Sequence, residues 1–290
     1  MSSAAPARFC VTILHSFRFT IGSRSSSQVL QIKSYWKMSD GFDLGKACLE
    51  GNSRLVIRHL EGLREEDETL ARKAVLQPDA DKRTPLHWAA SSGLSSEAIR
   101  LLCDCGGKDI LEARDSSGWT ALMIASSAGR AETVEQLLYA GADAIAANPR
   151  GQTSLHYAAS KGHLDVAKVL LEQGPGGGDV NARDGSKQCP LHRAATTGND
   201  AIVRLLLSPP TAKNGAKREK TRVNPQDRLG NTPLHLAFDS GNGSTAIILI
   251  EEGGADRNRL NQDDQKPEEM PGTNEIEQRK VLEYVRSHVG

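Results

Sequence analysis

The sequence lacks net charge, long hydrophobic runs and a regular cysteine pattern. Its 290 residues include 36 basic and 36 acidic side chains and 5 cysteines at irregular spacing. An odd, irregular set of cysteines is not typical of a disulfide framework, so we expect a reducing compartment. No apolar run approaches the roughly 20 residues of a membrane-spanning helix, so we expect no membrane partner.

The first 37 residues lack acidic side chains and any repeat character. They hold five basic residues and eight serines, which leaves 31 basic and 36 acidic residues, a net charge of −5, in the rest of the chain. That balance argues against a nucleic-acid partner. We expect residues 1–37 to be a disordered N-terminal extension. It is either a presequence of the mitochondrial type or an upstream extension, and the second is favoured because repeats begin directly after Met38.

One phrase recurs along the remaining chain. It reads "KRTPLHWAASSG" from Lys82, "GQTSLHYAASKG" from Gly151, "KQCPLHRAATTG" from Lys187 and "GNTPLHLAFDSG" from Gly230. The Thr positions lie 36, 33, 36, 43 and 34 residues apart; they are Thr84, Thr120, Thr153, Cys189, Thr232 and a degenerate Lys266. A period near 33 with this phrase is typical of ankyrin repeats. We therefore predict an all-α ankyrin-repeat solenoid of about seven helix-turn-helix units with short hairpin turns.

Each position of the phrase has a physical role. Threonine caps a first helix through its hydroxyl, and proline fits the first helical position, where no amide is needed. A leucine points into the stack, and small alanine pairs let neighbouring helices approach closely. Glycine ends the first helix in a left-handed conformation. An apolar pair eight and nine residues after each of these glycines predicts a second helix.

The repeat pattern divides the ankyrin-repeat domain, residues 38–290, into seven units. The terminal units are atypical, as expected for units with one face in water. The predicted units are 38–78 (N-terminal cap), 79–114, 115–147, 148–183, 184–226, 227–260 and 261–290 (C-terminal cap).

Turns and insertions separate the units. Asp or Asn opens each turn and glycine supplies a positive φ, but Lys82 and Lys187 replace that glycine, so we expect those two turns to be less tight. "GPGGG" at 174–178 is expected to be a flexible insertion, because no phosphate-loop sequence surrounds it. The basic segment 208–223 is interpreted as a solvated loop, with a nuclear localisation signal or an anionic-partner contact as the alternative.

Histidines at one repeated position raise the question of metal or catalytic chemistry. Successive stacked helices lie about 8–10 Å apart, too far for these side chains to share a zinc ion. We expect each histidine to form hydrogen bonds within its own repeat. No nucleophile-elbow or Walker sequence occurs, so we expect no enzyme, no cofactor and no metal. The four histidines are His87, His156, His192 and His235.

Recognition of another protein is the remaining function. In this architecture the turns and first helices form a binding face, and Trp, Tyr and Arg are frequent anchors of interfaces. Trp88 either packs on a neighbouring helix or is exposed, whereas Trp119, at a turn tip, is expected to be exposed. The predicted binding residues are Asp81, Arg83, Trp88, Trp119, Arg150, Tyr157, Lys161, Arg193 and Arg228.

The sequences of the individual repeats resemble those of the gankyrin family. The resemblance covers residues 39–290 and depends on the ordered series "RTPLHWAASSG", "GWTALMIASSAGRAETVEQLL", "GQTSLHYAASKGH", "CPLHRAATTGN" and "GNTPLHLAFDSGN". It implies a chaperone that binds the C-terminal domain of one proteasomal AAA ATPase subunit and assists assembly of the proteasome regulatory particle. It also implies a protein of cytoplasm and nucleus, monomeric when free.

The resemblance implies contacts at Arg83, Trp88, Trp119 and Lys161, with Arg83 and Lys161 pairing with acidic side chains of the ATPase domain. Animal members carry a Leu-x-Cys-x-Glu motif for retinoblastoma binding. Residues 236–240 read "LAFDS" and lack its Cys and Glu, so that activity is not carried over.

Ankyrin folds serve many functions, so two alternatives stay open. One is a signalling regulator that inhibits a transcription factor or a cyclin-dependent kinase. The other is a targeting adaptor that uses the basic segment or the N-terminal extension.

Overall fold

The computed structural model describes residues 42–173, 178–211, 219–272 and 275–289. By its internal contacts the chain divides into two units, Met1–Phe42 and Asp43–Gly290, and every helix described here belongs to the second. The predicted extension at 1–37 lies outside the described residues, as do most of the "GPGGG" insertion and residues 212–218 of the basic segment.

The second unit consists of helix pairs, which confirms the predicted all-α ankyrin class. Within the described residues there are 14 α-helices and one 3₁₀ turn, and the extended pairing is a single bridge between Ala147 and Thr153. The first helices are α5 (Pro85–Ser92), α7 (Ala121–Ser127), α9 (Ser154–Lys161), α11 (Pro190–Thr197) and α13 (Pro233–Asp239). The second helices are α6 (Ser96–Leu111), α8 (Ala131–Tyr139), α10 (Leu164–Glu172), α12 (Asp200–Leu207) and α14 (Gly243–Glu251).

Atypical helices flank these five pairs. At the N-terminal side are α2 (Leu44–Leu49), α3 (Ser53–Glu66) and α4 (Glu68–Leu76). At the C-terminal side are the 3₁₀ turn η1 (Pro267–Glu269) and α15 (Glu275–Val289), which packs on α14. Val281 and Val285 of α15 are buried, so this last helix covers the apolar side of the final pair.

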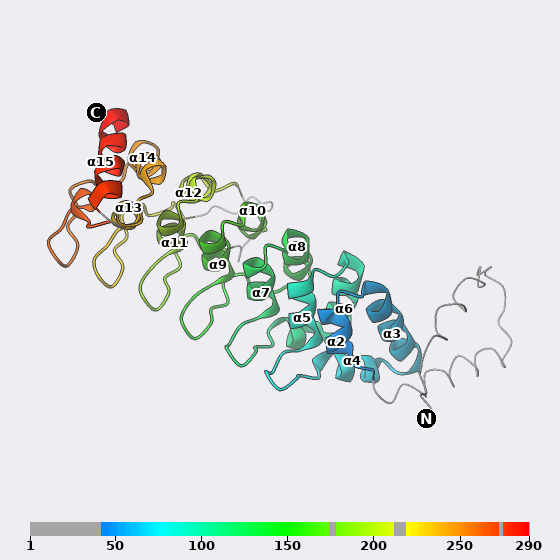
Figure 1. Cartoon of the computed structure of the whole chain (residues 1–290). Helices are drawn as coiled ribbons and strands as arrows, with labels where there is room; N and C mark the ends of the chain where they lie inside the picture. Colours follow the sequence, from blue (N-terminus) through cyan, green and yellow to red (C-terminus); the bar gives the residue numbers. More distant parts are fainter. Residues whose placement is uncertain (1–41, 174–177, 212–218, 273–274, 290) are drawn as a thin grey trace, which may run out of the picture. The chain divides into compact units, whose positions relative to one another are not determined.

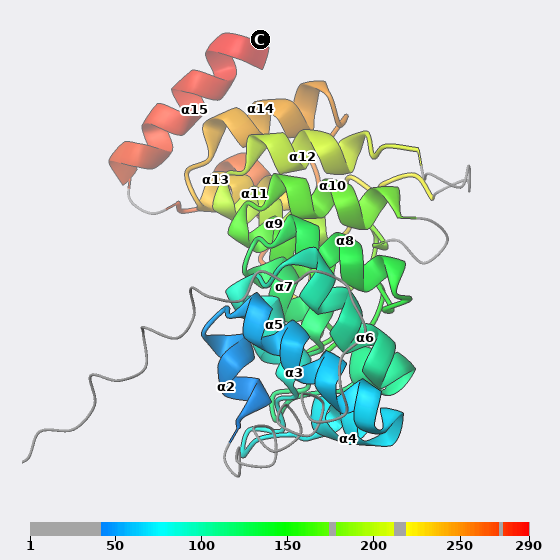
Figure 2. The same ribbon diagram turned by 90° about the vertical axis from the view of Figure 1, so that its right-hand side faces the viewer.

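First helices stack on first helices, and second helices on second helices. The contacts run from α2 through α5, α7, α9 and α11 to α13, and from α6 through α8, α10 and α12 to α14. Figures 1 and 2 show these two rows, with the long loops leaving the first-helix row at one edge. The shared leucine of each first helix is buried, and so are the alanine pairs that let the helices approach. The core therefore lies between the two rows.

A buried histidine joins four of the five repeats to the unit that follows. In α5, the Nδ1 atom of His87 accepts a hydrogen bond from the Thr84 amide at 3.1 Å. Its Nε2 atom lies 3.1 Å from the carbonyl oxygen of Trp119, in the following repeat. Because Nδ1 accepts, the ring carries its proton on Nε2 and donates to that carbonyl. The expected bond within the repeat is therefore present, but the bridge to the neighbour was not foreseen.

The same bridge recurs in three further repeats. Nε2 of His156 lies 3.1 Å from the Gln188 carbonyl, and Nε2 of His192 lies 3.1 Å from the Asn231 carbonyl. The last bridge, from His235 to the Gln265 carbonyl, reaches the C-terminal cap. The second repeat has Met123 at this position and cannot make the bond. Four identical bonds thus set the spacing of the first helices.

The fourth residue of the turn has a left-handed backbone conformation whether it is glycine or lysine. Lys82 and Lys187 adopt φ values of 59° and 60°, close to the 76° of Gly118 at the same position. Their amides donate to the carbonyls of the Asp three residues earlier at 3.0 and 2.8 Å, compared with 2.8 Å for Gly118. The expectation of looser turns at the two lysines was wrong. The hydrogen bonds of the turn hold each lysine in a conformation that costs a non-glycine residue about 1–2 kcal/mol.

The bridging histidines make stability depend on pH. Burial lowers the pKa of all four imidazoles, and it lowers the pKa of His192 from 6.5 to about 4. The unfolded chain therefore binds protons first as the pH falls, so stability is present above pH 6.5 and declines below it. His192 alone is expected to lower the free energy of unfolding by about 2 kcal/mol between pH 7 and pH 5.

Urea unfolding of the full chain at pH 7 and pH 5 measures this loss. The window lies above the ordinary pKa of the carboxylates, so histidines dominate it. His192→Gln should reduce the pH dependence, whereas His288→Gln, at an exposed position of α15, should leave it unchanged. Equal stability of the parent protein at the two pH values would contradict the account.

Candidate protein-binding surface

An Asp or Asn organises each of the six turns. In the second turn, Oδ1 of Asp115 accepts hydrogen bonds from the amides of Ser117 and Trp119, both at 2.9 Å. The two acceptor bonds fix the hairpin and leave the other side-chain atom free for a second partner. The same pair of bonds is made by Asp79, Asn148, Asp184, Asp227 and Asn261.

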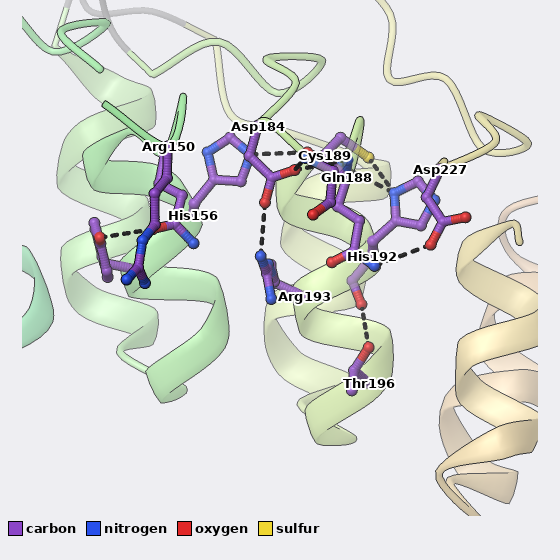
Figure 3. A network of polar contacts seen from close by, with 12 residues as sticks. Arg150, His156, Asp184, Gln188, Cys189, His192, Arg193, Thr196 and Asp227 are labelled. Atoms are coloured by element: carbon purple, nitrogen blue, oxygen red, sulfur yellow. Dashed lines mark hydrogen bonds and ion pairs between the residues drawn. The ribbon is translucent and has the colours of Figure 1, made fainter. Parts of the chain in front are cut away.

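In three repeats this second atom binds the residue that follows the bridging histidine. Trp88 donates through Nε1 to Oδ2 of Asp79 at 2.9 Å, and Nδ2 of Asn148 donates to the Tyr157 hydroxyl at 2.8 Å. In the fourth repeat, the Arg193 guanidinium donates to Oδ2 of Asp184 at 2.6 Å, as Figure 3 shows. Three of the predicted binding residues are therefore fixed to the turn nine residues before them.

Arg193 and Asp184 form the most buried of these ties. The Asp184 side chain is 2% exposed and that of Arg193 is 31% exposed. Burial raises the pKa of Asp184, but hydrogen bonds from Arg193 and the Gln188 amide outweigh it and hold that pKa below its usual value. Arg193 is thus a structural partner of the turn as well as a candidate contact.

Arg83 is also engaged within the fold. Its Nε atom lies 3.4 Å from Oδ2 of Asp115 in the next turn, and its guanidinium carbon lies 4.7 Å from the centre of the Trp88 ring. The Trp88 ring lies beside Gly45 of α2 on its other flank, so it is half-buried. Only part of the Arg83 guanidinium is therefore accessible to a binding partner.

Trp119 is half-buried, which differs from the expected exposure. Its ring stacks against Tyr157 of the following repeat, with the ring centroids 4.2 Å apart. Aromatic pairs at this distance stabilise by about 0.5–1.5 kcal/mol beyond their buried area. The pair forms one wall of a hollow of about 630 Å³ on the first-helix side. That hollow brings together four predicted residues: Arg83, Trp119, Arg150 and Tyr157.

Pro149 lies at the junction of two turns beside this hollow. The residue after each turn Asp or Asn donates its amide to the preceding turn, as Ser116 does to the Asp81 carbonyl at 2.8 Å and Gly185 to the Arg150 carbonyl at 2.7 Å. Proline has no amide hydrogen, so the junction between the second and third turns lacks this bond. Pro149 lines the hollow that remains there.

The other predicted residues lie at exposed positions. Asp81, Arg150 and Arg228 are at turn tips, and Lys161 is the last residue of α9. Sequence reasoning missed Leu229, which is 62% exposed at the tip of the fifth turn. The sequence contained a sign of this, because Leu229 is apolar whereas the matching positions of the other turns are all polar. Those positions hold Asp81, Ser117, Arg150, Ser186 and Asp263.

The buried Cys189 and His192 resemble a nucleophile and base. Sγ of Cys189 lies 3.1 Å from Nδ1 of His192, in the place of the threonine of other repeats (Figure 3). Burial raises the pKa of this thiol, and both side chains are almost inaccessible to solvent. A thiol kept protonated and covered is not an activated nucleophile, so the pair caps the helix.

Two further kinds of feature concern the described ranges of the chain, namely metal sites and membrane-spanning helices. There, no group of three or more His, Cys, Asp or Glu side chains is arranged to hold a metal ion. None of the helices in that part of the chain is both long enough and apolar enough to span a bilayer.

Comparison with known proteins agrees with this architecture. The family model for ankyrin repeats (three copies) matches residues 44–148, 114–184, 138–218 and 176–261. The probable 26S proteasome regulatory subunit p28 of Saccharomyces cerevisiae is 33% identical over 198 residues, which is 68% of this chain and 82% of the yeast protein.

Two further relatives match a smaller share of this chain. Human ankyrin repeat domain-containing protein 63 is 32% identical over 62% of this chain, which spans 45% of the human protein. The E3 ubiquitin-protein ligase KEG of Arabidopsis thaliana is 31% identical over 54% of this chain and 9% of its own length.

The fold and its turn network define an ankyrin-repeat protein. Within that class, the chain belongs to the gankyrin family of proteasome-related proteins.

Arginines at two positions of the face should differ in their effect on stability. Arg193→Ala removes the partner of a buried carboxylate and is expected to lower the free energy of unfolding by about 2 kcal/mol. Arg228→Ala, at an exposed turn tip, should change it by less than about 0.5 kcal/mol. Chemical denaturation of both variants measures the difference. Equal losses would mean that the Arg193–Asp184 tie is not structural.

Proposed function

We propose that this protein binds the C-terminal domain of a proteasomal AAA ATPase subunit and assists assembly of the proteasome regulatory particle. The observation that carries the proposal is the 33% identity to the yeast regulatory subunit p28 across 82% of that protein. The action is binding without catalysis. While bound, the chaperone blocks docking of the ATPase on the core particle, and it leaves once the base is assembled.

The binding face comprises the turn tips and the first helices. Around the hollow at Pro149, the aromatic pair Trp119–Tyr157 provides a fixed apolar wall, and Arg83 and Arg150 supply positive charge. Lys161 extends that charge along α9. Such a surface suits a helical or loop segment that carries acidic side chains beside an apolar anchor.

Fixed side chains favour tight binding on this face. Trp88, Tyr157 and Arg193 are each held by a turn Asp or Asn, so little rotamer freedom is lost when a partner docks. Each immobilised side chain otherwise costs about 0.5–1.5 kcal/mol on association. The free protein acts as a monomer in cytoplasm and nucleus, where the ATPase subunits are assembled.

Charge reversal tests the face directly. Arg150→Glu with Lys161→Glu is expected to weaken binding of the ATPase domain at least tenfold, because two favourable charge pairs become repulsive. Both side chains are exposed, so the fold should melt normally. Arg83 is left unchanged because reversal there would place a glutamate beside Asp115. Isothermal calorimetry with the isolated ATPase C-terminal domain measures the affinity.

A matched variant controls for charge. Arg100→Glu with Lys168→Glu makes the same change on the second helices α6 and α10 and should leave the affinity unchanged. Weakening by both variants alike would reject the first-helix face. Purification of the tagged protein with a kinase or a transcription factor, and without any proteasomal ATPase, would instead support the signalling regulator.

A further inference from the structure

A second hollow lies among the last three turns. It has a volume of about 690 Å³ and is bordered by the turns that begin at Asp184, Asp227 and Asn261. The cationic side chains that line it are Arg183, Lys187, Arg222 and Arg259.

This hollow differs from the hollow at Pro149 in its place along the stack and in its lining. All its lining residues lie outside helices, on the later turns and on the chain segments that lead into them. The hollow at Pro149 lies among the first three turns, is lined by turn residues together with residues of α5, α7 and α9, and shares no lining residue with the second hollow. A ligand of the second hollow would therefore contact the loop side of the later repeats.

Hydrogen bonds hold the cations of the hollow near one another. The guanidinium of Arg183 donates to the Gln226 carbonyl at 3.4 Å, and that of Arg259 donates to Oε1 of the same Gln226 at 3.3 Å. The Arg222 amide donates to Oδ1 of Asn181 at 2.9 Å, which fixes the backbone there. The guanidinium groups of Arg183 and Arg259 are thus held by one residue, and the backbone that carries Arg222 is fixed beside them.

The acidic groups nearby do not balance this charge. Asp227 is the acidic residue of the lining, and its carboxylate already accepts bonds from the Leu229 and Asn231 amides and from Nε2 of Gln188. Glu219 lies 3.9 Å from Arg222, with both side chains mostly exposed, so the pair is screened by solvent. Within the described residues, the hollow keeps an excess of positive charge.

We propose that this hollow binds an anionic peptide segment whose carboxylates or phosphates pair with Lys187 and the surrounding arginines. Arg183, Arg222 and Arg259 lie on the segments that lead into three successive turns. Stacked helices lie about 8–10 Å apart, so we expect these cations to recur at about that interval. A peptide in the polyproline II conformation has three residues per turn and rises about 9 Å over them, so every third side chain meets the next cation.

Peptide is favoured over nucleic acid by two observations. The lining contains no aromatic side chain on which a base could stack. The chain from residue 38 onward carries a net charge of −5, so the positive charge is local and would not extend along a nucleic-acid backbone. Guanidinium groups bind carboxylates and phosphates through two parallel hydrogen bonds, so both anions fit the same site.

The test uses the full chain and two labelled decapeptides. One carries glutamate at every third position and the other phosphoserine at the same positions, which separates the two sources of the anion. Fluorescence anisotropy should show saturable binding of at least one peptide, weakened by added salt. Lys187→Gly with Arg222→Gln should weaken it about tenfold, because two exposed charge pairs are lost. Glycine at 187 suits the positive φ, so the fold is retained.

A matched variant has the same loss of charge elsewhere. Lys82→Gly with Lys168→Gln changes one lysine at the same turn position and one on α10, and it should bind the peptides as the parent does. Failure of both peptides to bind the parent protein, or equal binding by the two double variants, would overturn the proposal. Tighter binding of a ten-nucleotide single-stranded RNA, lost in the Lys187 and Arg222 variant, would also overturn it. None of these outcomes depends on the ATPase.

Discussion

A single buried imidazole joins four of the five repeats to the unit that follows. One ring nitrogen accepts the amide that opens the first helix, and the other donates to a carbonyl of the next turn. Both bonds are shielded from water, where an unpaired polar group would cost about 1–3 kcal/mol. The four rings therefore favour one register of the stack. At the junction of α7 with α9, where Met123 replaces the histidine, the helices pack through buried apolar side chains instead.

The Asp and Asn side chains of the turns likewise form two kinds of hydrogen bond each. One side-chain atom closes the hairpin, and the other holds an arginine, tyrosine or tryptophan on the adjoining helix. The interaction that stabilises a repeat thus also orients the side chains that a partner would meet. Pro149, which cannot donate the bond that other turns make, lines a hollow together with the aromatic pair Trp119–Tyr157. Residues that stabilise the repeats are also those proposed to meet a partner, so substitutions there need a stability control.

Local patterns were predictable from the sequence. Leucine and alanine spacing indicated the buried stripe, and glycines such as Gly93 and Gly162 indicated helix ends, which do adopt left-handed φ values of 74° and 77°. The conformation of Lys82 and Lys187 was mispredicted because residue preference was weighed without the hydrogen bonds that impose it.

Contacts between repeats were harder to predict. The partners of His87 and Arg83 lie 32 residues further along the chain, and a repeat read by itself does not contain them. For the same reason Trp119 was expected to be exposed, although its ring meets Tyr157 of the next unit. The type of repeat can be recognised from a short stretch of sequence. The contacts of the candidate binding residues cannot, because their partners lie in the next repeat of the stack.

Amide hydrogen exchange of the full chain, with and without the ATPase C-terminal domain, tests the central claim most directly. The account predicts added protection in the turn tips and in α5, α7 and α9, with α8, α10 and α12 unchanged. Protection confined to those second helices, or none at all at saturating ATPase domain, would contradict it.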